Sequence, residues 1–154
     1  MFGLFKSKKK SLIPEEEQQL IVSAIQQAER NTSGEVRVYI ESRCAYMDPM
    51  DRAREVFFKL KMNNTANHNA VLIYVALTDR QMALFGDEGI YRKTGGDPYW
   101  LHELTIMRSH FREGQIAQGI AACVADIGTA LSDHFPFSRS SDKNELPDDI
   151  VFGD

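Results

Sequence analysis

Four acidic side chains follow the predicted ends of two neighbouring strands in the middle of the chain. Asp79 comes directly after one apolar run, and Asp87, Glu88 and Asp97 follow the next, in backbone that glycines make flexible. In open α/β sheets, ligands favour the crevice beyond the carboxyl ends of strands. Hard cations take several oxygen ligands, which carboxylates and carbonyls supply. The sequence therefore predicts an acidic rim that binds a divalent cation, Ca²⁺ or alternatively Mg²⁺, through these four residues.

Ordinary structural roles are the competing interpretation of the same residues. Asp79 has the chemistry of a hairpin turn, and Asp97, which precedes Pro98, has that of a helix cap. Glu88 is able to pair with an arginine, and the loop lacks the spacing of an EF-hand. Turn and cap chemistry alone is the favoured interpretation, and the cation site is its alternative.

A central strand carries this rim. Residues 70–77 form an unbroken apolar run rich in β-branched side chains, which is typical of a strand covered on both faces. Residues 78–80 break the run with turn chemistry, and apolar residues resume at 82–85, which indicates a hairpin. Residues 35–41 alternate apolar and polar side chains. This alternation predicts a strand with one face buried and the other partly wet.

Helices are predicted before, between and after these strands. Apolar side chains at helical spacing mark four of them, at residues 14–30, 49–60, 99–111 and 116–131. The charged residues of the second helix, among them Arg52 and Glu55, are expected to face water. The segment between Ile90 and Gly96 is predicted to be irregular.

The order of these elements predicts the fold class. A parallel strand pair joined by a helix and extended by an antiparallel hairpin gives a mixed sheet with helices on both faces. We therefore expect an α/β fold, a three-layer α/β/α sandwich with a mixed, mostly four-stranded sheet. The domain is expected over residues 14–135, between a flexible basic N-terminus (1–13) and an acidic, largely disordered tail (136–154). Within that tail, residues 150–152 form a short apolar patch that is able to dock.

Composition limits the classes of partner. A net charge of −4 argues against nucleic acid as the main partner. Cys44 and Cys123 are expected to be buried, inert thiols. The absence of a long apolar run argues against a membrane span, so a cytoplasmic protein is expected. We also expect a monomer. Met1–Lys10 joins three large apolar residues to lysines, so weak peripheral membrane contact is an alternative to a frayed terminus.

Several separated segments together resemble the TPM domain family. The segments that carry the resemblance are Thr32–Val36, Asn69–Ala76, Asp79–Arg80, Gly86–Ile90, Phe111–Gly114 and Gly119–Ile120. The resemblance covers roughly residues 15–135, and it implies the same α/β fold. The chain departs from the common pattern at residues 68–70, where His-Asn-Ala replaces Asp-Asn-Gly and removes one potential acidic ligand.

The resemblance implies two functions of different classes. One plant member resembles an acid phosphatase and binds calcium, and other members modulate membrane-protein assembly or receptors. The leading hypothesis is a non-catalytic module that binds a protein partner near the membrane and carries a weak Ca²⁺ site. The alternative is a metal-dependent phosphomonoesterase, in which Asp79 acts as base or nucleophile beside Asp87 and Glu88, and Arg80 offsets phosphate charge.

Overall fold

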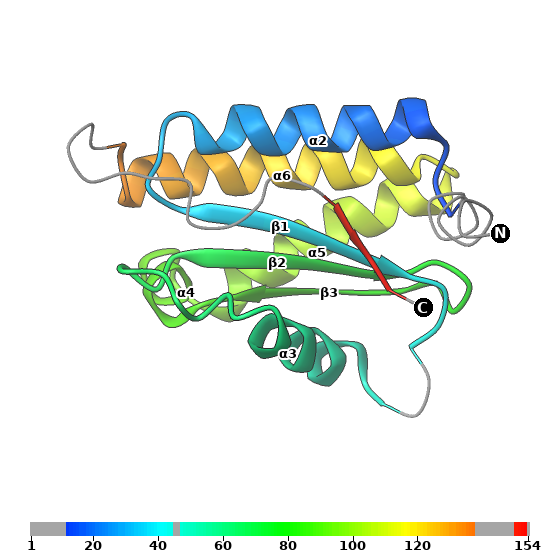
Figure 1. Ribbon diagram of the computed structural model, residues 1–154, viewed down its shortest axis with the longest axis horizontal. Coiled ribbons are helices and arrows are strands. Elements are labelled where there is room, and N and C mark those ends of the chain that lie inside the picture. Colours follow the sequence, from blue (N-terminus) through cyan, green and yellow to red (C-terminus); the bar gives the residue numbers. More distant parts are fainter. Residues whose placement is uncertain (1–11, 45–46, 138–149, 154) are drawn as a thin grey trace, which may run out of the picture.

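The computed structural model describes residues 12–44, 47–137 and 150–153. Within these ranges the elements follow one another as α2 (Glu15–Glu29), β1 (Glu35–Glu41), α3 (Pro49–Lys59), β2 (Ala70–Ala76), β3 (Gln81–Gly86), α4 (Glu88–Lys93), α5 (Asp97–Arg112), α6 (Ile116–His134) and β4 (Ile150–Phe152). Figure 1 shows the sheet between α2 and α6 on one side and α3 on the other. The predicted three-layer α/β/α sandwich is confirmed.

The sheet is mixed and has four strands in the order β3-β2-β1-β4. β1 runs parallel to both β2 and β4, and β3 runs antiparallel to β2. β4 comes from the tail that the sequence predicts to be largely disordered, and it consists of the short apolar patch Ile150–Phe152. The apolar patch docks beside β1 because Ile150 lies buried against the sheet.

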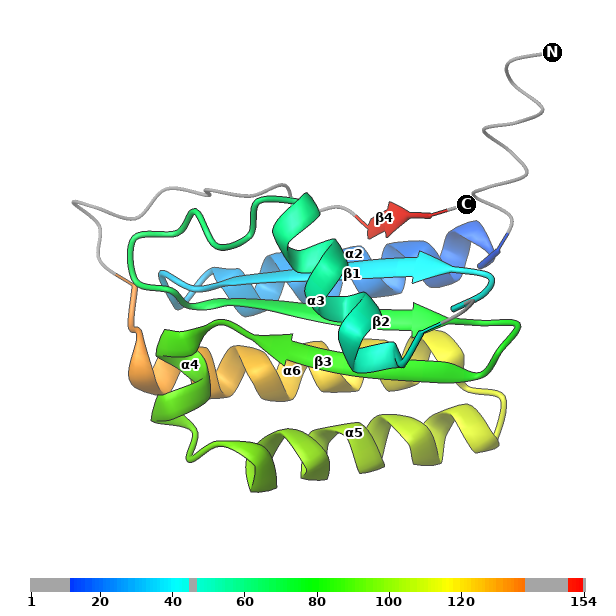
Figure 2. The ribbon, with the colours of Figure 1, turned by 90° about the horizontal axis from the view of Figure 1, so that it is seen from below.

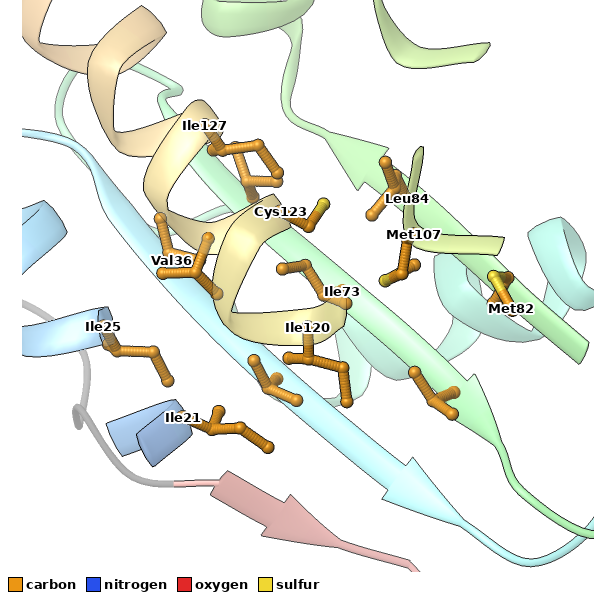
Figure 3. Close-up of a cluster of buried hydrophobic side chains, with 14 of the residues drawn as sticks. Ile21, Ile25, Val36, Ile73, Met82, Leu84, Met107, Ile120, Cys123 and Ile127 are labelled. Carbon is orange, nitrogen blue, oxygen red and sulfur yellow. The ribbon is translucent and has the colours of Figure 1, made fainter. Parts of the chain in front are cut away.

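Two hydrophobic cores lie on opposite faces of the sheet. The larger core fills the space between the sheet and α2, α5 and α6, with Ile25, Val36, Ile73 and Ile120 directed toward one another (Figure 3). The smaller core lies under α3. Because α3 covers the second face, β1 is buried on both faces, and the partly wet face predicted for it is not found.

The connection after β3 differs from the sequence prediction. The segment expected to be irregular contains helix α4, which Asp87 caps by accepting a hydrogen bond from the Glu88 N–H at 2.8 Å. Gly89 permits this start, since a Cβ atom there would lie 2.4 Å from the carbonyl oxygen of Asn67. Asp97 is the first residue of α5 rather than its cap, which is Gly96 at φ 82°.

The strand register defines two opposite edges of the sheet. Glu41 pairs with Ala76 where the parallel strands end, and we call this end the carboxyl edge. Val71 pairs with Gly86 where the parallel strands begin and β3 ends, and we call this end the amino edge. In Figure 2 the β2–β3 hairpin lies at one end of the molecule with the α5–α6 connection, and α4 lies at the other end.

Candidate functional site

The four acidic residues singled out in the sequence are divided between the two edges. Asp79 follows β2 at the carboxyl edge, as predicted, but Asp87 and Glu88 follow β3 at the amino edge. Strands of this length separate the two edges by roughly 20 Å. The predicted rim of Asp79, Asp87, Glu88 and Asp97 is therefore not formed, because β3 runs antiparallel and returns the chain to the far end of the sheet.

Asp79 ties together two loops at the carboxyl edge. Its Oδ2 accepts a hydrogen bond from the backbone N–H of Cys44 at 2.7 Å, and its Oδ1 lies 3.6 Å from a guanidinium nitrogen of Arg43. Both contacts come from the segment after β1. Asp79 thus holds that segment against the β2–β3 turn. This role is structural, but it is a contact between two loops and not the hairpin-turn hydrogen bonding expected from the sequence.

The other three acidic residues gather at the amino edge. Asp87 caps α4, and its second oxygen lies 3.3 Å from Nδ1 of His68. Glu88 pairs with Arg92 one turn along α4. The side chain of Asp97 accepts a hydrogen bond from the hydroxyl group of Tyr91, which raises the pKa of that hydroxyl.

These partners bear on the predicted cation site. In the ranges that the structure describes, no three side chains of His, Cys, Asp or Glu are arranged to hold a metal ion. Each carboxylate at the amino edge already contacts a donor of the protein itself. The cation site stays a prediction, and its candidate ligands at one place are Asp87, Glu88 and Asp97.

The same three carboxylates line a pocket of about 440 Å³, which we call the amino-edge pocket. Its apolar walls come from α3, β3 and α5, through Met50, Phe85, Trp100, Leu101 and Leu104. Trp100 is buried and donates a hydrogen bond from Nε1 to the Thr94 hydroxyl at 3.0 Å, which orients the indole ring. By contrast, Leu101 is 61% exposed and Met50 is 40% exposed. Large apolar side chains therefore surround the pocket while remaining open to solvent.

A buried ionic network that sequence reasoning missed lies on the α3 face. Arg52 donates two hydrogen bonds to Glu41, one from Nε at 2.9 Å and one from Nη2 at 3.0 Å. Tyr74 donates a third hydrogen bond to the same carboxylate. The prediction that Arg52 faces water is wrong. No signal in the sequence indicates this contact, because Glu41 lies on the face of the strand that the alternating pattern predicts to be partly wet.

A second buried carboxyl group was also missed. Glu103 on α5 is 4% exposed, and one of its oxygens has no hydrogen-bond partner in the described structure. Burial, followed by the charge of Asp126 and a hydrogen bond with it, raises the pKa of Glu103 to about 7. Nearby Cys123 is a free, buried thiol whose pKa burial raises. The predicted inert character of both cysteines agrees with their burial as free thiols.

Arg80 is the remaining candidate from the sequence, and it lies apart from the amino-edge acids. It adopts φ 53° in the β2–β3 turn at the carboxyl edge. Residues 1–11, which include the predicted membrane-contact segment Met1–Lys10, lie outside the described residues. In the part of the chain that the structure describes, no helix has both the length and the apolar character needed to cross a bilayer.

Comparison with known proteins gives one family and several similar folds. The model of the TPM domain matches residues 7–130 of the chain. The NMR structure of the BA42 protein from the psychrophilic bacterium Bizionia argentinensis is 40% identical, with a TM-score of 0.83 over 92% of this chain and 95% of that one. None of the curated proteins compared with the chain matches it significantly.

Two more distant structures share the fold. The N-terminal domain of a protein from P. gingivalis is 17% identical, with a TM-score of 0.68 over 83% of each chain. The N-terminal domain of the cg2496 protein from Corynebacterium glutamicum is 13% identical, with a TM-score of 0.61 over 92% of this chain and 81% of that one. At these identities the likeness concerns the arrangement of helices and strands alone.

Proposed function

This chain belongs to the TPM domain family, and we propose that it is a non-catalytic module that binds a protein partner through the amino-edge pocket. The observation that carries the proposal is the ring of large apolar side chains left exposed around that pocket. Leu101, Met50 and Tyr91 are 61%, 40% and 37% exposed, and all three line it. Contiguous apolar surface with a polar border is typical of interaction sites.

The charge of the border indicates the kind of partner. Asp87, Glu88 and Asp97 place three carboxylates at the pocket, and among the residues that the structure describes Arg54 is the one cation that lines it. The guanidinium of Arg54 lies 5.7 Å from the ring centroid of Phe85, so it is engaged with an apolar wall. We therefore propose a partner segment with large apolar side chains followed by lysine or arginine. The apolar side chains would enter the pocket and the cations would meet the carboxylates.

A weak Ca²⁺ site at the same carboxylates is the second part of the proposal. Oxygen ligands from Asp87, Glu88 and Asp97 suit a hard cation. The ion would have to displace the existing contacts with His68, Arg92 and the Tyr91 hydroxyl. We expect affinity in the millimolar range for this reason, with Mg²⁺ as the alternative ion.

A phosphatase that uses Asp79 together with Asp87 and Glu88 has no support in this geometry. The two groups lie at opposite edges of the sheet, so one small substrate cannot contact both. Asp79 is also occupied by the Cys44 N–H and by Arg43. For these reasons the partner-binding module remains the proposal.

The test for partner binding is an NMR titration with a short amphipathic peptide of leucine, phenylalanine and lysine. We expect amide shifts confined to the elements that line the pocket, at Met50 and Arg54 of α3 and in the segment from Phe85 to Leu104, with a Kd on the order of 100 μM. Leu101→Asp should weaken binding about tenfold or more, because it removes an apolar contact and adds repulsion. Leu20→Asp is the matched control, since Leu20 is similarly exposed at 42% but lies on α2, away from the pocket.

A second peptide, in which glutamates replace the lysines, tests the role of charge. It should bind at least several-fold more weakly to the wild-type protein. Equal affinity for both peptides, or equal loss in the Leu101 and Leu20 variants, would overturn the proposed site. A separate Ca²⁺ titration should shift the Glu88 amide only at millimolar concentrations. No shift at those concentrations would remove the cation from the proposal.

A further inference from the structure

We propose that a second pocket, at the carboxyl edge, binds the phosphate group of a phosphorylated organic molecule through Arg80, Arg108 and Arg112. This pocket of about 600 Å³ lies between the β2–β3 hairpin, the last turns of α5 and the start of α6. Figure 2 shows these three elements at one end of the molecule. The inference goes beyond the proposed function, since it concerns other residues at the opposite edge.

The three arginines are a concentration of positive charge without a counter-charge. Among the described residues, no carboxylate lines the pocket, and none of the three guanidinium groups belongs to an ion pair. Asp79 precedes Arg80 but is held by Arg43 and the Cys44 N–H. Arg108 and Arg112 stand one turn apart on α5, where like charges destabilise a helix. A bound anion would offset this repulsion.

The other residues that line the pocket indicate which chemical groups the ligand carries besides its phosphate. Met82, Phe111 and Ile116 give the pocket an apolar floor, which suits the organic part of a phosphate ester better than an inorganic anion. The start of α6 also faces the pocket through Gly114 and Ile116. Its N-cap residue, Gln115, makes no side-chain cap, so the N–H groups of the first turn are available to an acceptor.

Arginine is the side chain best suited to phosphate. Its planar guanidinium donates paired hydrogen bonds that match two phosphate oxygens, and it remains charged at any ordinary pH. A purely structural role is the alternative for Arg112, because a cation in the last turn stabilises a helix C-terminus. That role does not account for Arg80, which comes from the hairpin. The convergence of two elements therefore favours a ligand.

The first experiment is a titration of the full chain with phenyl phosphate, followed by NMR. We expect shifts at the arginine Nε–H groups and at the amides of residues 114–118. Replacing both helical arginines (Arg108→Gln with Arg112→Gln) should weaken binding about tenfold or more. Arg92→Gln is the matched control, because Arg92 is an exposed helical arginine at the other edge, and it should leave the affinity unchanged.

A second experiment distinguishes a soluble ligand from a lipid headgroup. Sedimentation with vesicles of phosphatidylcholine and phosphatidic acid is compared between the wild-type chain and the double arginine variant. Both proteins carry the same lysines at residues 6–10, so a difference reports on the pocket. Vesicle binding that depends on the arginines, without phenyl phosphate binding, supports a lipid source. Phenyl phosphate binding alone supports a soluble one.

Two results would overturn the inference. The first is no detectable binding of either probe to the wild-type chain. The second is binding that the double variant and the Arg92 control reduce equally, since this would reflect overall charge. Arg108 and Arg112 are exposed, so replacing them leaves the core intact. An unchanged amide spectrum outside the pocket verifies the fold of the variant.

Discussion

Two buried glutamates on opposite faces of the sheet meet opposite electrostatic surroundings. Glu41 and Glu103 are each 4% exposed. Glu41 receives two hydrogen bonds from Arg52 and one from Tyr74. Glu103 faces another carboxyl group, that of Asp126, whose negative charge raises its pKa further after burial has done so. Two equally buried carboxyl groups therefore differ in their chemistry. Glu41 forms an ion pair with Arg52, whereas the pKa of Glu103 is raised.

This difference between Glu41 and Glu103 affects how α3 and α5, the two helices that flank β3, are held in the fold. Arg52 joins α3 to the sheet through a carboxylate, and the pKa of Arg52 is raised, first by its hydrogen bond with Glu41. The packing of α5 against α6 includes Glu103, whose pKa of about 7 places a change of charge near neutrality.

The consequence concerns both proposed pockets. Helix α5 contributes Leu101 and Leu104 to the amino-edge pocket, and Arg108 and Arg112 to the arginine-lined pocket. Helix α3 contributes to the amino-edge pocket alone. Helix α5, which both pockets share, thus carries the carboxyl group of Glu103, whose pKa is raised to about 7. Helix α3 is instead held to the sheet by the ion pair between Arg52 and Glu41.

Removing the charge of Glu41 should have the largest effect on stability. Glu41→Gln preserves the size of the side chain but leaves the Arg52 guanidinium, whose side chain is 20% exposed, without its buried counter-charge. We expect a loss of about 3 kcal/mol in the free energy of unfolding, measured by urea denaturation.

The matched control for this change is Glu55→Gln. Glu55 also pairs with Arg52, but its side chain is 51% exposed. Its loss should change the free energy of unfolding by no more than about 0.5 kcal/mol. Similar losses of unfolding free energy in Glu41→Gln and Glu55→Gln would show that burial adds nothing to the Glu41–Arg52 ion pair. The contrast between Glu41 and Glu103 would then be unsupported.

The second-largest expected effect is a fall of about 2 kcal/mol in the free energy of unfolding as pH rises. The folded chain keeps the proton of Glu103 up to about pH 7, whereas its ordinary pKa is 4.5. Between these values the folded state binds more protons than the unfolded state, so stability falls as pH rises and levels off above the folded pKa. Urea denaturation at about pH 5 and about pH 8 measures the difference.

Glu103→Gln isolates this contribution, since the variant retains every other titrating group. The wild-type chain should lose about 2 kcal/mol more stability between the two pH values than the variant does. An identical loss in both proteins would mean that Glu103 is already ionised in the folded state at the lower pH. Glu41 and Glu103 would then differ only in the groups that their carboxylates contact.

The apolar pattern of the sequence predicts most of this fold. The unbroken run at Ala70–Ala76 and the spacing of apolar residues in the main helices carry local information, and the elements form where that information places them. Ile150–Phe152 is different, because three residues are too short to indicate a strand until β1 offers an edge. Pairing of distant segments is not contained in a local pattern.

The candidate sites were less predictable for the same reason. Asp79 and Asp87 are close in sequence, but an antiparallel return places them at opposite edges. The ionic contact between Glu41 and Arg52 depends on how α3 crosses the sheet, and neither residue alone indicates it. Glu103 falls on the apolar face of α5, where a charged residue in the pattern was the one available warning.

The smallest expected effect concerns the hydroxyl group of Tyr74. Tyr74→Phe removes one of three hydrogen bonds to Glu41, and we expect a loss of about 1 kcal/mol in the free energy of unfolding. Burial, followed by this hydrogen bond, raises the pKa of Tyr74, so the donor keeps its proton at any ordinary pH. Tyr91→Phe is the control, because Tyr91 also donates to a carboxylate, Asp97, but at an exposed site. The loss for Tyr91→Phe should be clearly smaller than the loss for Tyr74→Phe. Losses of equal size would contradict the view that burial strengthens the hydrogen bonds to Glu41.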